Sequence, residues 1–235
     1  MRKRRNMKRM MLVIAVLTLL GCGLAASADT NNAHFYFAQI SDTHIGDRDN
    51  AERTRKVVEA INRLPMPIEF TAVTGDFTME RTDDGVTFTN GVSILKRLKM
   101  PFHLLPGNHD ILPNKIQETS QAFTNFTGGF LTRAEYQGVV CLFVYTEPLA
   151  DAFTVKGYEP LKQFEQALKD AGDKPVIVFH HTPAVEDFYN NAMHPGWPRD
   201  ASDRWGELLN AYHVRAVIAG HFHRDEMHWL GNVPL

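Results

Sequence analysis

Short apolar runs alternate with amphipathic stretches along most of this 235-residue chain. The apolar runs have the length of buried strands and end in small or turn residues, so we expect strands at residues 35–40, 68–74, 102–105, 139–145, 176–179 and 216–219. Apolar residues three or four positions apart predict helices at residues 50–64 and 86–98 and around residues 161–168. We expect Asn50 to cap the first helix and Gly172 to end the third.

This alternation of strands and helices predicts the α/β class. Most of the expected strands are nearly continuous in apolar residues, which is typical of sheets buried on both faces. Neither an internal repeat nor a low-complexity linker divides residues 29–235, so we interpret them as one domain.

Residues 1–28 form a different pattern, in which six basic residues precede an apolar run from Met10 to Leu20. The run is shorter than a membrane span and small residues follow it, which is typical of an export signal. Residues 26–28 (Ala-Ser-Ala) fit a cleavage site that would release a soluble domain. Residues 19–22 (Leu-Leu-Gly-Cys) instead resemble a bacterial lipobox, which would leave Cys22 lipidated and the domain anchored to the membrane. Both interpretations predict a periplasmic or extracellular protein.

Removing the export signal makes the chain acidic. Residues 1–28 contain six of the 25 basic residues and none of the 27 acidic ones, so the rest has a net charge of −8 with His neutral. An acidic domain repels a nucleic-acid backbone, so a nucleic-acid duplex is a poor partner and a small diffusible substrate fits better. Cys141 is the one cysteine left besides Cys22, and we therefore expect no internal disulfide framework.

Residue types that bind metals follow five of the expected strands. They occur in the blocks Asp42-Thr43-His44, Gly75-Asp76, Gly107-Asn108-His109-Asp110, His180-His181 and Gly220-His221-Phe222-His223. In open α/β sheets ligands gather at the carboxyl ends of strands, so we expect the blocks to converge on one site. Asp, His and Asn without Cys suit Mn²⁺, Fe, Zn²⁺ or Co²⁺, and seven such ligands are too many for one ion and about right for two.

The spacing within the blocks also favours shared ligation. Asp42 and His44 are separated by one residue, so on an extended segment both side chains face the same way, and His221 and His223 repeat this spacing. Asp76 follows a glycine, which lets the backbone come close and leaves a carboxylate able to bridge two cations.

The five ordered blocks resemble the pattern of the calcineurin-like metallophosphoesterase superfamily: D-x-H, G-D, G-N-H-D/E, H and G-H-x-H. They span Asp42 to His223, which is most of the domain, and the chain most resembles bacterial class III cyclic-nucleotide phosphodiesterases and glycerophosphodiesterase-like members. The resemblance implies a four-layer α/β/β/α sandwich, in which two mixed sheets are flanked by helices.

The resemblance also implies the role of each residue. Asp42, His44 and His223 would hold a first metal ion, Asn108, His181 and His221 a second, and Asp76 would bridge them. Because His180 and His181 are adjacent, either could be the ligand of the fourth block, and the form His-x-Pro favours His181. His109 would be the catalytic residue that stabilises charge on the phosphoryl oxygens or protonates the leaving alkoxide.

The implied activity is hydrolysis of small phosphate esters, most readily diesters, by in-line attack of a metal-held hydroxide. The alternatives are a phosphomonoesterase of the same fold and a binding module that no longer turns over. The chain departs from the family at Met79, where many relatives have an acidic residue that orients the catalytic histidine; either Glu80 or Asp110 substitutes for it, or His109 lacks a carboxylate partner. It also ends at Leu235, twelve residues after His223, where relatives usually continue, which favours a C-terminally truncated domain.

Four other histidines match no block, so we interpret His34, His103, His213 and His228 as structural. Residues 193–197 are either a lid over the substrate or, as we favour, an ordinary surface loop. Trp205, Leu208 and Leu209 have the spacing of a helix packed on the core.

Overall fold

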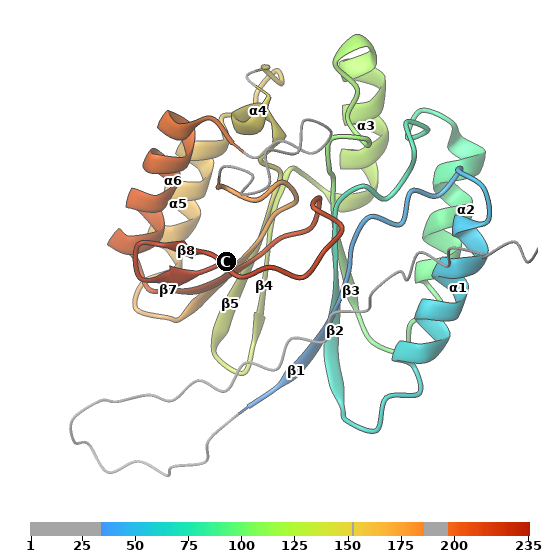
Figure 1. Cartoon of the computed structure of the whole chain (residues 1–235), viewed down its shortest axis with the longest axis horizontal. Coiled ribbons are helices and arrows are strands. Elements are labelled where there is room, and N and C mark those ends of the chain that lie inside the picture. Colours follow the sequence, from blue (N-terminus) through green and yellow to red (C-terminus); the bar gives the residue numbers. More distant parts are fainter. Residues whose placement is uncertain (1–33, 152, 186–196) are drawn as a thin grey trace, which may run out of the picture.

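Two sheets lie face to face, and each is covered by helices on its outer surface (Figure 1). The structure is a computed structural model that describes residues 34–151, 153–185 and 197–235. Its strands are β1 (Tyr36–Ile40), β2 (Ile68–Thr74), β3 (Phe102–Leu105), β4 (Leu131–Tyr136), β5 (Val139–Val144), β6 (Val176–Phe179), β7 (Val214–Ile218), β8 (Trp229–Leu230) and β9 (Val233–Pro234). Its helices are α1 (Asn50–Ile61), α2 (Gly85–Leu95), the 3₁₀ turn η1 (Pro113–Lys115), α3 (Ile116–Thr127), α4 (Glu147–Ala150), α5 (Pro160–Ala171) and α6 (Arg199–Ala211).

The first sheet has the order β1-β2-β3, and both of its strand pairs are parallel. The second has the order β4-β5-β6-β7, in which β4 is antiparallel to β5 and the remaining pairs are parallel. The four-layer α/β sandwich is thus as expected, with the mixed pairing in the second sheet. A small hairpin of β8 and β9 follows β7.

Alternation of side chains along the strands divides the core into three parts. Phe37 and Phe70 of the first sheet meet Phe179 and Phe143 of the second, with ring centroids 5.5 Å apart for Phe37–Phe179 and 6.1 Å for Phe70–Phe143. The opposite faces of the strands pack against α1 and α2 on one side and against α5 and α6 on the other (Figure 1). Both sheets are therefore buried on two faces, which fixes their strand ends firmly.

The predicted elements are present with shifted ends, because helix ends depend on local contacts that periodicity does not show. The helices expected at residues 50–64 and 86–98 end at Ile61 and Leu95, and Gly172 ends α5 with a φ of 60°. The prediction that Asn50 caps α1 was wrong: the N-cap is Asp49, and the Asn50 amide donates to the His44 carbonyl at 3.1 Å.

Several of the predictions concern residues outside the described ranges. The expected export signal, the cleavage site at residues 26–28 and Cys22 are among them, as are residues 193–196. Trp197 itself is buried, so it belongs to the core and not to a surface loop. Within residues 34–151, 153–185 and 197–235, no helix has the length and apolar content needed to cross a membrane. In the same ranges Cys141 is a free thiol buried between the sheets.

Candidate metal centre

The carboxyl ends of the two sheets are joined by hydrogen bonds at one end of the sandwich. The Gln39 amide at the end of β1 donates to Thr74 Oγ1 at 2.9 Å and to the Ala219 carbonyl beyond β7 at 2.7 Å. The amide of Gly220 donates to the His181 carbonyl at 2.9 Å. These contacts bring the blocks that follow β1, β2, β6 and β7 to a common edge.

The backbone around the expected ligands is left-handed and not extended. Asp42, His44 and Asp76 have φ values of 56°, 44° and 48°, and His221 and His223 have values of 70° and 54°. The expectation of extended segments was therefore wrong, although the side chains do converge. A left-handed non-glycine residue costs roughly 1–2 kcal/mol, and such residues concentrate at functional sites where neighbours enforce them.

Asp42, His44 and His223 form one group, here named the outer group. His223 Nε2 lies 3.1 Å from Asp42 Oδ1 and 3.4 Å from His44 Nε2. The second oxygen of Asp42 accepts the backbone N–H of His221 at 3.1 Å, so this carboxylate also fixes the loop that carries His223. The group lies at the rim, because the His223 side chain is 44% exposed.

Asp76, His181 and His221 form a second, buried group, here named the inner group. His181 Nε2 lies 3.1 Å from Asp76 Oδ2 and 3.2 Å from Asn108 Oδ1. The other ring nitrogen of His181 lies 2.8 Å from the Thr74 carbonyl, which fixes the ring orientation. The ring of His221 meets that of His181 edge to face at 5.2 Å.

Asp76 lies between the two groups. Its Oδ2 is 3.1 Å from His181 Nε2 and 3.8 Å from His44 Nε2, while its Oδ1 accepts the backbone N–H of His109 at 2.9 Å. The loops come this close because Gly107 has no side chain: a Cβ there would lie 2.6 Å from the His181 ring and overlap Asp76. The structure thus brings together all seven residues expected to bind metal.

The charges of the cluster are set by burial and by carboxylate–histidine contacts. Burial opposes ionisation of Asp76 and Asp42, but His181 and His223 outweigh it and keep both carboxyl pKa values below their usual range. The hydrogen bond to Asp42 raises the pKa of His223, and Asp76 raises that of His181 against the effect of burial. Burial lowers the pKa of His44. Anionic carboxylates and imidazoles that must lose their protons on binding are typical of sites made for cations.

The donor set fits borderline-hard divalent ions. The cluster offers carboxylate oxygens, imidazole nitrogens and one amide oxygen, a combination that suits Mn²⁺, Fe, Zn²⁺ or Co²⁺. The three ligand atoms of each group lie within 4.8 Å of one another, which is the separation that a shared ion needs. The two groups, with the Asp76 carboxylate between them, could therefore bind two ions.

The adjacent histidines of the fourth block lie in different environments. His181 belongs to the inner group, whereas His180 is buried away from it, with its ring centroid 5.6 Å from that of Trp197 and 5.5 Å from that of Trp205. Burial lowers the pKa of His180 to about 3, so this ring is neutral. The geometry therefore favours His181 as the ligand.

His109 lies beside both groups, with its ring centroid 5.2 Å from that of His44. Of its two expected partners, Glu80 is in place: His109 Nδ1 lies 3.4 Å from Glu80 Oε1, and the Glu80 N–H donates to the His109 carbonyl. Asp110 instead accepts the N–H groups of Phe77, Thr78 and Gly107 at 2.7–3.0 Å. It ties the loop after β2 to the loop after β3, and burial together with the Asp76 charge raises its pKa to about 6.

The four histidines that we interpreted as structural lie outside the metal groups of the described chain. His103 Nε2 lies 2.8 Å from the Tyr136 hydroxyl, and His228 Nε2 lies 2.7 Å from Glu226 Oε2. His213 faces Asp173 at 3.8 Å, and His34 meets Tyr36 edge to face.

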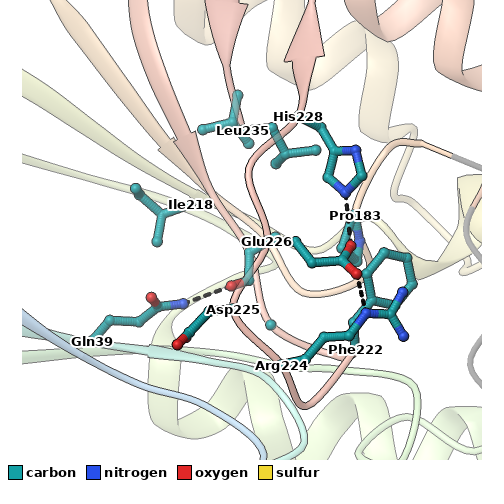
Figure 2. Close-up of a pocket in the computed structure, with 12 residues that line it drawn as sticks. Gln39, Pro183, Ile218, Phe222, Arg224, Asp225, Glu226, His228 and Leu235 are labelled. Carbon is teal, nitrogen blue, oxygen red and sulfur yellow. Dashed lines mark hydrogen bonds and ion pairs between the residues drawn. The ribbon is translucent and has the colours of Figure 1, made fainter. Parts of the chain in front are cut away.

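A separate cavity of about 260 Å³ lies behind the loop of the last block (Figure 2). Gly220 and Phe222 line it, whereas His221 and His223 do not, so the loop separates the cavity from the metal cluster. Arg224 and His228 are both paired with Glu226 there. Glu226 thus joins Arg224 and His228 in one charged network at the wall of this cavity.

Sequence reasoning missed a buried carboxylate near the cluster. Glu147 follows β5, the one parallel strand of the second sheet after which no motif is found, and burial raises its pKa to about 7. The position of Glu147 just after a strand could have indicated a role at the site. A single Glu between Thr146 and Pro148 matches no metal-ligand pattern, however, so the sequence did not single it out.

Comparisons with known proteins identify the family of this chain. The model of the family described as calcineurin-like phosphoesterase matches residues 35–225. A probable cyclic nucleotide phosphodiesterase of Rhodopseudomonas palustris is 27% identical over 214 residues, covering 80% of this chain and 71% of that protein. A serine/threonine-protein phosphatase of Mus musculus is 26% identical, covering 81% and 70%. A probable glycerophosphodiester phosphodiesterase of Arcobacter nitrofigilis is 27% identical, covering 79% and 71%.

Solved structures share the fold. A dimetal phosphatase from Danio rerio matches with a TM-score of 0.62 at 14% identity, covering 85% of each chain. A purple acid phosphatase from yellow lupin matches with a TM-score of 0.54 at 13% identity, covering 80% of this chain and 40% of the other. Both likenesses concern the four-layer architecture.

Proposed function

The chain belongs to the calcineurin-like phosphoesterase family, and from this premise we propose that it is a metal-dependent hydrolase of small phosphate diesters. The observation that carries the proposal is the convergence of seven residues on one site, where Asp76 of the inner group also faces His44 of the outer group: Asp42, His44, Asp76, Asn108, His181, His221 and His223. We assign the outer group to one ion, the inner group with Asn108 to a second, and the bridge to Asp76. Two bound ions would supply Lewis acidity toward the phosphoryl oxygens and lower the pKa of a bound water.

The chain's own residues would position the substrate and move the proton. His109 stands next to the bridging carboxylate through its backbone N–H and leaves its ring at the rim, beside His44. There the ring can donate a hydrogen bond to a phosphoryl oxygen or a proton to the leaving oxygen. Glu80 would orient the ring by accepting a hydrogen bond from its Nδ1–H, and donation from Nε2 on the substrate side then requires the doubly protonated ring, which the Glu80 carboxylate would stabilise.

Two observations bear on the substrate class. The relatives named as cyclic nucleotide and glycerophosphodiester phosphodiesterases favour a diester as the substrate of this chain. The relative named as a murine protein phosphatase supports a phosphate monoester as the second candidate. Purified protein loaded with Mn²⁺ should hydrolyse bis-p-nitrophenyl phosphate faster than p-nitrophenyl phosphate. The reverse preference would replace the diesterase by a phosphomonoesterase. No hydrolysis of either ester, with two bound ions confirmed by metal analysis, would indicate a binding module. A panel of cyclic nucleotides and glycerophosphodiesters would then identify the substrate.

We further propose that the protein is exported. The basic and apolar pattern of residues 1–28 supports export, and Cys22 offers a lipid anchor. Labelled palmitate should be incorporated by the full chain and lost in Cys22→Ser. Incorporation that persists in Cys22→Ser would contradict the lipobox, and absence of label in both would favour cleavage after residue 28.

A further inference from the structure

The end of β5 contributes a buried carboxylate that the proposed mechanism does not use. Glu147 is the first residue of α4, and its side chain is 1% exposed. Its Oε1 accepts the backbone N–H of Thr182 at 3.2 Å, and its Oε2 accepts the Thr182 hydroxyl at 2.8 Å. A buried carboxylate is costly unless it is hydrogen-bonded, and both of these bonds go to the residue that follows His181.

The carbonyl of Thr182 also accepts a hydrogen bond from a buried side chain. Trp197 Nε1 donates to the Thr182 carbonyl at 2.7 Å. Trp197 is itself 2% exposed, and its ring packs at 5.4 Å from that of Trp205 in α6. The N–H, the hydroxyl and the carbonyl of Thr182 are thus all bound by buried side chains, so its peptide units have little freedom.

Thr182 is fixed where the inner group is assembled. On its N-terminal side, the His181 carbonyl accepts the N–H of Gly220, the residue before His221. The His181 ring contacts the Thr74 carbonyl through Nδ1 and faces Asp76 and Asn108 through Nε2. A shift of the 181–182 peptide would therefore move His181 and His221 of the inner group. It would leave in place Asp42 and His44, the two members of the outer group that follow β1.

We propose that Glu147 is a positioning residue for the inner metal site, acting by clamping Thr182 and through it His181. The proposal rests on the proposed function only in taking the inner group as a metal site. It concerns the hydrogen bonds of Glu147, both of which go to Thr182; the Glu147 charge also acts electrostatically on His181, and Glu147→Gln separates the two effects.

The test is Mn²⁺ titration of the metal-free full protein by calorimetry, together with kcat and KM for bis-p-nitrophenyl phosphate. Glu147→Leu removes both bonds and should weaken one of the two Mn²⁺ sites by roughly tenfold or more while leaving the other unchanged. Glu147→Gln can still accept the N–H through its carbonyl and donate its amide to the hydroxyl, so its Mn²⁺ affinities should stay near wild type. Thr182→Val should weaken the same single site, and Thr182→Ser should restore it.

Tyr158→Phe is the matched control, because Tyr158 donates a buried hydrogen bond to the Tyr145 carbonyl without contacting Thr182. It should lower the Tm and leave both Mn²⁺ affinities unchanged.

Unchanged Mn²⁺ affinities in Thr182→Val and Glu147→Leu would overturn the proposal. A Glu147→Gln protein that binds Mn²⁺ as weakly as Glu147→Leu would also overturn it, since the charge of Glu147 would then be the cause. If Glu147→Leu does not fold, Thr182→Val and Glu147→Gln decide alone. Wild-type protein that binds Mn²⁺ but hydrolyses no ester would contradict the proposed function and leave this clamp measurable; wild-type protein that binds no Mn²⁺ would contradict both.

Discussion

The inner and outer groups use the same residue types but differ in how they are held. The side chains of Asp76 and His181 are 2% and 0% exposed, whereas that of His223 is 44% exposed. The residues of the inner group follow β2, β6 and β7, and hydrogen bonds such as that between the His181 ring and the Thr74 carbonyl hold them in place. The outer group lies at the rim, where a substrate can reach it. The inner group is thus held rigidly inside the fold, whereas the outer group is open to solvent on the side where the substrate of the proposed hydrolase would bind.

His221 and His223 show this difference within a single block. Phe222 between them is buried, and the left-handed backbone at both histidines turns one ring into the inner group and the other to the rim. Two histidines with ligand spacing thus belong to different groups.

The largest effect is expected from Asp76→Asn, because Asp76 lies between the two groups and its carboxylate faces both His181 and His44. An amide cannot bridge two cations as a carboxylate does, so both ions should be lost. Hydrolysis of bis-p-nitrophenyl phosphate should fall by roughly 10³-fold or more, since the Lewis-acid contribution amounts to several kcal/mol of transition-state stabilisation. Two ions retained with near-normal turnover would contradict the bridge.

The next effect separates the groups. His223→Ala should empty the outer site and His221→Ala the inner site, and each should abolish most turnover because one ion cannot contact both the attacking and the leaving oxygen. Metal content measured after dialysis should be about one ion per chain in each variant. Loss of both ions from His223→Ala would show that the outer group also supports the inner one. His228→Ala, a histidine outside both groups, is the control and should keep two ions.

A smaller effect is expected from His109→Asn, which removes the proton donor while leaving both groups intact. The rate should fall by about 10²–10⁴-fold, the usual contribution of general acid–base catalysis. The Mn²⁺ content should be unchanged, because His109 reaches Asp76 through its backbone N–H and that bond remains. A loss of metal would place His109 among the ligands, beside His44 and Asp76.

The smallest effect is expected from Glu80→Gln, because the Glu80 side chain is 60% exposed and 3.4 Å from His109. About tenfold loss in kcat with little change in KM is expected if Glu80 orients the ring. Its effect should vanish in a His109→Asn background, which a double-mutant cycle measures. Additive losses in that cycle would mean that Glu80 acts independently of His109. Glu118→Gln, another acidic position but one on α3, is the control and should match wild type.

The order of strands and ligand blocks could be predicted from the sequence, because burial on both faces produces apolar runs and a ligand block follows five of the six expected runs. Val176–Phe179 followed by His180-His181 is an example, and the family resemblance follows from the same blocks. α3 and β4 were not predicted, since α3 buries only Thr119 and Phe123 and the residues of β4 are half-buried or exposed.

What only the tertiary structure decided is how the blocks meet. The one-residue spacing suggested extended ligand segments, whereas Asp42 and His44 are left-handed and donate their backbone N–H groups to the carbonyls of Gly75 and Asp76, just after β2. The pairing of Glu80 with His109, and of Glu147 with Thr182, joins residues 29 and 35 positions apart in sequence. The sequence by itself therefore determined which residue types stand at the strand ends. Packing of the two sheets decided which of them share a site, because side-chain proximity across sheets has no local signature in the chain.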